Sequence, residues 1–138
     1  MPAKDLYHDS VKAALQKDGW IITADPLLLR AGLITLYVDL GAERLLTAEK
    51  DNRKIAVEVK SFLQASDISE FHTALGQFMN YRYALNKQEP DRSLYLAIPF
   101  EVYDVFFSQP FIQEILRYYH VQTIVFNPEQ EVIRQWND

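Results

Sequence analysis

The 138-residue chain has no cysteine, only four glycines and no long uninterrupted apolar stretch. Without cysteine it can form no disulfide, thiolate metal site or catalytic thiol. The longest apolar region, residues 27–40, is interrupted by Arg30 and Asp39, which argues against a membrane span. The amino-terminal stretch MPAKDLYHDS lacks the basic start and apolar run of a secretory signal. We therefore expect a cytoplasmic protein with no membrane partner.

Several catalytic patterns are also missing. The three histidines, His8, His72 and His120, have no zinc-ligand spacing and are predicted to be ordinary surface or boundary residues. The sequence contains no Gly-rich phosphate loop and no G-x-S-x-G elbow for a nucleophilic serine. These absences exclude the common zinc, P-loop and serine-hydrolase sites.

Basic residues are scarce in the second half of the chain. The formal net charge is −5, and residues 1–60 hold nine Lys/Arg against nine Asp/Glu, whereas residues 61–138 hold five against ten. A protein that binds nucleic acid by bulk attraction alone would be basic. Any contact with a polyanion must therefore be local, or be arranged by a partner.

What is present indicates one globular domain over residues 1–138, because the composition is 49% hydrophobic and 13% aromatic. Apolar periodicity predicts a helix over residues 4–18, and short strands over 20–23, 43–48 and 54–60, the last two joined by a polar loop at 50–53. Residues 27–36 are ambiguous, since their apolar run fits either a helix or irregular structure.

The second half is predicted to begin with a long helix. The stretch DISEFHTALGQFMNYRYAL carries an apolar stripe after a capping box formed by Asp67 and Glu70. A strand follows at 93–98, then helical material over 101–119 broken near Pro110, and finally strands at 121–126 and 131–136. The predicted order is αβββαβαββ, which implies a mixed central β-sheet flanked by helices, an α/β (α+β mixed) fold.

The stretch IAVEVKSF, residues 55–62, carries the most informative charges. Alternation along a strand puts Glu58 and Lys60 on one face. A lone E-x-K is usually a solvated surface pair, but a hairpin would return the preceding strand, with Asp39 at its start, alongside Glu58. Two carboxylates suit Mg²⁺ or Mn²⁺ with retained waters. Lys60 would then orient or deprotonate an attacking water, or stabilise negative charge on phosphate.

The long helix adds a third element, because Gln77 and Tyr81 are four residues apart and lie on one stripe with Glu70 and Ala74. Alone, such a stripe is more often an ordinary polar helix flank. In the order Asp39, Glu58-Val59-Lys60, Gln77-x-x-x-Tyr81, however, the chain from residue 4 to 98 resembles the PD-(D/E)XK nuclease superfamily, restriction-endonuclease-like in fold, and its RecB-like branch with a Q-x-x-x-Y helix. The resemblance implies that Asp39, Glu58 and the Val59 carbonyl bind metal, that Lys60 is catalytic, and that Gln77 and Tyr81 support the site or contact DNA.

At a finer level, the segments DLYHDSVKAALQKDGW, YVDLGAERLLTAEKDNRKIAVEVKSF and VQTIVFNPEQEVIRQWN look like the XisH family. That resemblance runs nearly end to end. It implies a fdxN-element excision controlling factor of cyanobacteria, nuclease-like, that acts on DNA with a partner called XisI. One departure from the superfamily is Val38, where many members have proline before the first acid. Resolvase-like relatives often add an acid from the first helix, for which Asp5, His8 and Asp9 are the candidates.

Two functions follow. The first is a Mg²⁺-dependent DNA endonuclease. The second is a catalytically silent factor that keeps the nuclease fold and works through contact with a XisI-like protein, which the acidic second half and its dense aromatic residues favour. A homo-oligomer is a further expected assembly.

Overall fold

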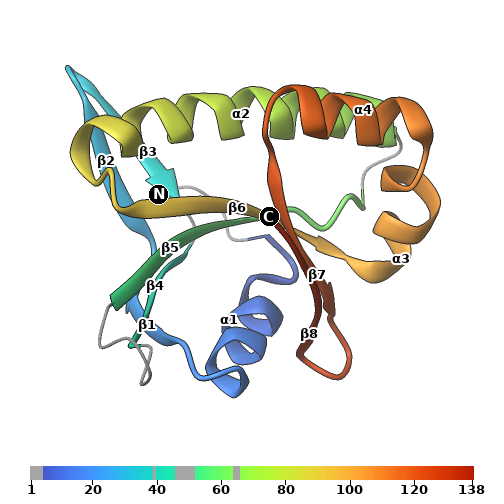
Figure 1. Cartoon of the computed structure of the whole chain (residues 1–138), viewed down its shortest axis with the longest axis horizontal. Coiled ribbons are helices and arrows are strands. Elements are labelled where there is room, and N and C mark those ends of the chain that lie inside the picture. The colour runs from blue at the N-terminus through green and yellow to red at the C-terminus, as the bar shows by residue number, and fades with distance from the viewer. Residues whose placement is uncertain (1–4, 39, 46–51, 64–65) are drawn as a thin grey trace.

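The structure is a computed structural model that describes residues 5–38, 40–45, 52–63 and 66–138 (Figure 1). In chain order its elements are α1 (His8–Lys17), β1 (Ile21–Ala24), β2 (Leu27–Ala31), β3 (Ile34–Val38), β4 (Leu40–Leu45), β5 (Asn52–Val59), α2 (Asp67–Gln88), β6 (Arg92–Pro99), α3 (Phe100–Val102), the π-helix η1 (Tyr103–Phe107), α4 (Pro110–Tyr118), β7 (Gln122–Asn127) and β8 (Val132–Asn137).

Six of these strands form one mixed sheet in the order β1-β4-β5-β6-β7-β8. The inner pairs β5–β6 and β6–β7 are parallel, while β1–β4, β4–β5 and β7–β8 are antiparallel. Parallel neighbours need a crossover, which α2 supplies between β5 and β6. Figure 1 shows α2 and α4 over one face of the sheet and α1 on the other. The predicted mixed sheet with flanking helices is confirmed.

The predicted order αβββαβαββ is wrong in one segment, because residues 27–38 form the two-stranded hairpin β2–β3. Ala31 pairs with Ile34, so the turn has two residues, and its Gly32 has φ +64, a conformation that favours glycine. Leu28 is exposed while Leu29 is fully buried. This alternation is the signature of a strand with one buried face.

The hairpin is attached to the end of α2. The side chain of Gln88 donates to the carbonyl of Arg30, and its Oε1 accepts from Arg30 N at 3.2 Å. The side-chain amide of Gln88 thus bonds both the N–H and the carbonyl of Arg30, as a neighbouring strand would. The hairpin therefore has a fixed position against the helix that covers the sheet.

Helix α2 begins one residue earlier than its predicted capping box. Its N-cap is Ser66, whose hydroxyl accepts from Ser69 N at 3.3 Å, so Asp67 lies inside the first turn. Phe71 and Phe78 on its inner stripe are buried, as that stripe predicts, whereas Ile68 is 43% exposed. Ile68 lies in the first turn of the helix.

The predicted helical region before β7 is confirmed together with its break. The chain turns through α3 and η1 and then starts α4 at Pro110, which occupies the first turn of the helix. Proline is suited to that position because its missing N–H has no partner there in any helix.

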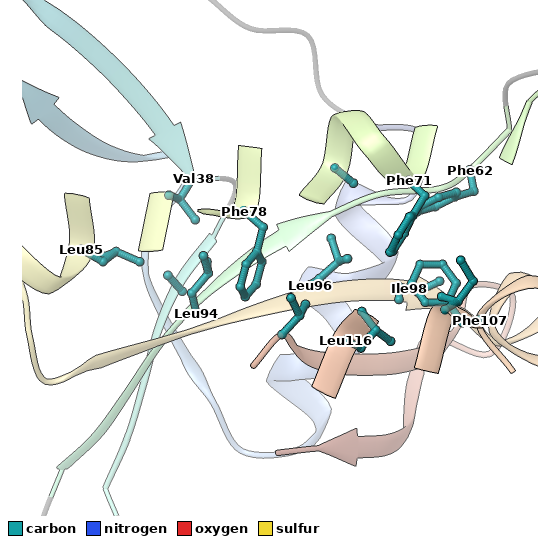
Figure 2. Close-up of a cluster of buried hydrophobic side chains, with 14 of the residues drawn as sticks. Val38, Phe62, Phe71, Phe78, Leu85, Leu94, Leu96, Ile98, Phe107 and Leu116 are labelled. Carbon is teal, nitrogen blue, oxygen red and sulfur yellow. The ribbon is translucent and has the colours of Figure 1, made fainter. Parts of the chain in front are cut away.

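Two apolar clusters lie on the two faces of the sheet. The larger one joins the inner faces of α2 and α4 to β5 and β6 and is drawn in Figure 2; its buried members include Ala56, Phe71, Phe78, Leu96, Ile98, Phe107 and Leu116. The smaller one packs α1 against the opposite face; its members include Val11, Leu15, Ile55, Val57, Val59, Tyr95 and Phe126. Successive residues of β5 therefore alternate between the two clusters.

Helix α1 is anchored to the segment after β1 by a polar group of three side chains. Asp25 accepts from Lys12 Nζ at 3.0 Å and lies 2.7 Å from His8 Nε2. His8 is only 2% exposed, so its prediction as a surface or boundary residue is wrong. Burial of Asp25 opposes its ionisation, but the hydrogen bonds and charges of Lys12 and His8 outweigh burial and lower the pKa of that carboxyl below 3.8.

No helix within the described ranges is long and apolar enough to cross a membrane.

The aromatic core predicts a large difference between two phenylalanines. Phe78 is 1% exposed in the cluster of Figure 2, whereas Phe111 on α4 is 64% exposed. Phe78→Ala is expected to lower the free energy of unfolding by about 3–5 kcal/mol through lost burial and the cavity left behind. Phe111→Ala, the matched control, is expected to change it by no more than about 0.5 kcal/mol. Urea denaturation at pH 7 measures both, and equal losses would contradict this core.

The Asp25 anchor predicts a pH-dependent loss of stability. Its pKa in the folded protein is below the ordinary value of 3.8, so the ionised carboxylate stabilises the fold above pH 3.8 and this contribution fades as the pH falls below it. Asp25→Asn is expected to cost about 1–3 kcal/mol at pH 7, the range for hydrogen bonds to charged groups, with the difference from wild type shrinking below pH 3.8. Urea denaturation across pH measures this, with exposed Asp104→Asn as the control. A pH-independent difference would contradict the assignment.

Candidate functional site at the end of strand β5

Glu58 and Lys60 lie at the end of β5, on the face of the sheet that α2 covers. Glu58 pairs in register with Leu96, a member of the cluster under α2, and the residue before it on the same face, Ala56, belongs to that cluster too. Lys60 Nζ lies 3.6 Å from Glu58 Oε1. The expectation that strand alternation brings this acid and this amine together agrees with the geometry.

The two side chains differ in their access to solvent. The Glu58 side chain is 6% exposed and that of Lys60 is 26% exposed. A buried carboxylate is costly unless a cation or hydrogen bonds compensate it. The ammonium of Lys60 supplies part of that compensation from the solvent side. The pair is therefore unlike the solvated surface pair that an isolated E-x-K usually represents.

The backbone holds this pair in place. Lys60 N donates to Ala97 O at 3.1 Å, which continues the parallel pairing with β6 one residue beyond β5. Val59, between the two charged residues, is 1% exposed and packs in the α1-side cluster. Its burial fixes which face Glu58 and Lys60 occupy.

Asp39, the predicted second carboxylate, lies outside the described residues. Its neighbour Leu40 pairs with Val57, the neighbour of Glu58, in the antiparallel register of β4 and β5. Within the part of the chain that the structure describes, no three His, Asp or Glu side chains gather where they could hold a metal ion. The described oxygen donors at this point, the Glu58 carboxylate and the Val59 carbonyl, are of the hard type that Mg²⁺ or Mn²⁺ prefers.

Gln77 and Tyr81 lie on the side of α2 that borders the core. Ala74, on the same stripe, is fully buried, and Tyr81 is partly buried against the cluster under α2. Part of this stripe therefore packs in the core and is not a purely polar helix flank. The Oε1 atom of Gln77 is buried and has no hydrogen-bond partner among the described residues. A buried polar atom of this kind requires an explanation.

Of the three acid or imidazole candidates near the first helix, Asp5 is hydrogen-bonded to the segment that follows β5. Asp5 Oδ2 accepts from Ser61 N at 2.9 Å, and its Oδ1 accepts from Tyr7 N at 2.9 Å. His8 instead binds Asp25, and Asp9 is exposed. Asp5 thus connects the start of α1 to the residue that follows Lys60.

A cavity of about 230 Å³ adjoins this edge and contains residues that sequence reasoning did not single out. Ser61, Glu101 and Glu129 line it, together with Tyr7, Leu63, Pro99, Val102 and Pro128. Glu101 and Glu129 each follow a parallel strand by two residues, and ligands of α/β sheets bind outside the carboxyl ends of such strands. Their position just after two predicted strands was the sequence signal that could have identified Glu101 and Glu129.

Comparisons with known proteins agree on one family. The family model described as XisH protein matches residues 1–134. The crystal structure of an XisH family protein from Nostoc punctiforme PCC 73102 is 50% identical, with a TM-score of 0.88 over 97% of this chain and 100% of that chain. That of a fdxN element excision controlling factor protein from Anabaena variabilis is 53% identical, with a TM-score of 0.88 over 98% of this chain and 100% of that chain.

None of the curated proteins compared with the chain matches it. The family model spans nearly the whole sequence, and both solved relatives share half of the residues and the fold. The chain therefore belongs to the XisH family.

Proposed function

We propose that the chain is a Mg²⁺- or Mn²⁺-dependent DNA endonuclease-like factor of PD-(D/E)XK type that takes part in the excision of a DNA element. The observation that carries this proposal is the buried Glu58 with Lys60 Nζ 3.6 Å away, at the end of a strand whose neighbour β4 begins directly after Asp39. The relative from Anabaena variabilis, described as a fdxN element excision controlling factor, supports the biological setting. A DNA substrate also fits a cytoplasmic location.

In this proposal each residue has a distinct role. Asp39, Glu58 and the Val59 carbonyl hold the metal, which when bound would polarise a phosphate oxygen and lower the pKa of a coordinated water. Lys60 orients or deprotonates the attacking water, or stabilises negative charge on the phosphate. Its partial exposure allows a phosphate to approach from solvent.

Gln77 and Tyr81 act from the helix above the strand. The buried Oε1 of Gln77 is an acceptor for a donor that enters the site, such as a metal-bound water or a water next to Lys60. Tyr81, partly buried beside the core, shapes the substrate side. Both roles depend on α2 lying over the face that carries Glu58.

A partner protein completes the proposal. The net charge of −5 disfavours DNA binding by this chain alone, and a XisI-like protein would supply the positive surface. Large apolar side chains are exposed outside the site, on the β2–β3 hairpin at Leu33 and Ile34 and on α4 at Phe111 and Tyr118. Exposed apolar side chains of this size support contact with another protein.

The same exposed apolar residues favour a second candidate, a catalytically silent factor that works only through protein contact. The two candidates differ in what Lys60 does. In the first, Lys60 is needed for cleavage and not for binding the partner. In the second, its replacement changes neither.

Cleavage by the purified complex tests the first candidate. Glu58→Gln, Lys60→Ala and Asp39→Ala are each expected to lower DNA cleavage with Mg²⁺ or Mn²⁺ by about 100-fold or more, because each removes charge that acts in the transition state. Lys54→Ala is the matched control, since Lys54 is a lysine of β5 that lies six residues before Lys60. Calorimetric titration with Mn²⁺ gives a second readout: Glu58→Gln should weaken metal binding and Lys54→Ala should not. Equal cleavage and equal Mn²⁺ affinity in all variants would end this proposal.

Co-expression with a XisI-like protein tests the second candidate. Lys60→Ala is expected to co-purify with the partner as wild type does while cleavage is lost, because Lys60 is not one of the exposed apolar residues that would contact the partner. Size-exclusion chromatography of the co-expressed pair measures complex formation. A Lys60→Ala complex that still supports excision of the DNA element in cells would identify the silent factor as the correct function.

A further inference from the structure

A second cavity among the described residues lies away from Glu58 and Lys60. It measures about 560 Å³ and is bordered by α2, η1, α4, the start of β7 and the end of β8. Neither Glu58 nor Lys60 lines it. Sites for small molecules occupy about 300–1,000 Å³, so this cavity has the size of a ligand site rather than of a bare ion.

The cavity concentrates the scarce cations of the second half of the chain. Residues 61–138 contain five Lys/Arg, and two of them, Arg82 and Arg117, line this cavity together with His120. A smaller cavity of about 180 Å³ shares Arg82 and His120 and adds Arg92. Three of the five basic residues thus gather along adjoining cavities in a region of net negative charge.

Two of these arginines are held in fixed positions. Arg82 Nη1 donates to His120 O at 2.7 Å, its Nη2 lies 3.1 Å from Met79 Sδ, and its guanidinium lies 5.4 Å from the ring centre of Phe78. Arg92, in the smaller cavity, is bound to Glu89 at 3.0 Å. Fixed guanidinium groups lose little side-chain freedom when they bind an anion.

Arg117 differs from both. It lies exposed in the last turn of α4, on the rim of the larger cavity. Its charge faces the same space as the fixed guanidinium of Arg82. The guanidinium group presents a planar fork of donors that matches phosphate in a bidentate manner.

The one carboxylate in the lining is already engaged. Asp138 Oδ1 accepts from the hydroxyl of Tyr95 at 2.6 Å, and its other oxygen lies 3.9 Å from Arg53. Burial first, and then the hydrogen bond and charge of Asp138, raise the pKa of Tyr95 to about 12 despite the opposing effect of Arg53. The hydroxyl therefore stays protonated as a donor to Asp138 at neutral pH.

The remaining lining suits a planar group with polar edges. Tyr103, Leu116 and Val121 are its apolar part, and Gln113, Gln122 and Asn137 add amides. The ring of Tyr103 is stacked with that of Phe107 at 6.2 Å, which leaves it oriented by the core. Amides beside an aromatic wall are the groups that read the edge and the face of a nucleobase.

We propose that this cavity binds a nucleoside 5′-phosphate, with Arg82 and Arg117 on the phosphate and Tyr103 beside the base. The phosphorylated nucleoside can be a free nucleotide or the 5′-terminal residue of a nucleic-acid strand. The smaller adjoining cavity, which shares Arg82 and His120, is where a following nucleotide would continue. The proposal does not depend on metal binding or cleavage at Glu58.

Titration of the purified protein with four compounds tests the proposal: inorganic phosphate, adenosine 5′-monophosphate, a 5′-phosphorylated trinucleotide and the same trinucleotide without the phosphate. Calorimetry is expected to detect binding of the mononucleotide, of the phosphorylated trinucleotide, or of both. A ligand that is detected should bind more tightly than inorganic phosphate. Whichever of these two binds more tightly identifies the source of the ligand. The unphosphorylated trinucleotide is expected to bind at least about 10-fold more weakly than its phosphorylated form, since hydrogen bonds between charged groups are lost.

Substitutions locate the binding. Arg117→Gln is expected to weaken the phosphorylated ligand about 10-fold to 100-fold, the range for loss of a charge-assisted hydrogen bond. Arg134→Gln is the matched control, because it removes the same charge from an exposed arginine on β8 that does not line the cavity. Glu58→Gln should bind the ligand as wild type does. Arg82→Lys, with its folding checked by thermal denaturation, should weaken binding while retaining the charge.

Three results would overturn the proposal. One is the absence of binding by both phosphorylated nucleoside ligands. Another is an equal loss of affinity in Arg117→Gln and Arg134→Gln, which would indicate only general attraction to positive charge. The third is inorganic phosphate that binds as tightly as the mononucleotide, which would remove the nucleoside from the assignment.

Discussion

The parallel pairing of β5 with β6 is the constraint on which the rest of the molecule depends. Six residue pairs fix its register, from Lys54 with Arg92 to Val59 with Ala97. Parallel neighbours cannot be joined by a tight turn, so the chain must cross over the sheet, and α2 provides the cover for one face. The crossover brings the carboxyl ends of β5, β6 and β7 to a common edge, where Lys60 and Ser61 leave β5 and Glu101 follows β6.

That pairing also explains why Glu58 is buried. Apolar side chains of β5 alternate between two clusters, so each strand position is covered by a helix on one side or the other. A charged residue before the end of such a strand has no route to bulk water except along its own face. The ammonium of Lys60, two residues on and nearer the edge, lies 3.6 Å from the Glu58 carboxylate. Burying this carboxylate costs free energy, and a bound cation would compensate that cost.

Local sequence patterns were sufficient for elements with strong periodicity or a strong break. The β-branched run around Glu58 predicted β5, the apolar stripe of Phe71 and Phe78 predicted α2, and Pro110 predicted the break before α4. The β2–β3 hairpin was missed because Leu27, Leu28 and Leu29 are all apolar, and only the fold decides that Leu29 is the buried one. A run of identical residues carries no period.

Contacts between residues far apart in the chain had no signal in the sequence. Asp5 meets Ser61 across 56 positions, and Arg82 meets His120 across 38. Neither separation corresponds to a helix or strand period, because each contact is formed by the tertiary fold. The predicted set Asp39, Glu58, Lys60, Gln77 and Tyr81 came instead from strand alternation, a predicted hairpin and helix spacing, combined with a resemblance. The geometry adds the 3.6 Å distance between Lys60 and Glu58 and the buried amide oxygen of Gln77.

The contact between Arg82 and His120 determines how the arginines of the large cavity differ in function. The carboxyl end of a helix has a partial negative charge, and Arg82 donates to the carbonyl of His120 just beyond α4. The guanidinium of Arg82 therefore already interacts with the end of this helix. Replacing Arg82 would disturb the packing at this helix end as well as the binding of any ligand. Arg117 lies on the exposed rim of the same cavity, so the potential that an incoming anion meets depends most on Arg117. In the proposed site the fixed guanidinium of Arg82 and the exposed guanidinium of Arg117 line the same cavity, so both charges would attract an anion there.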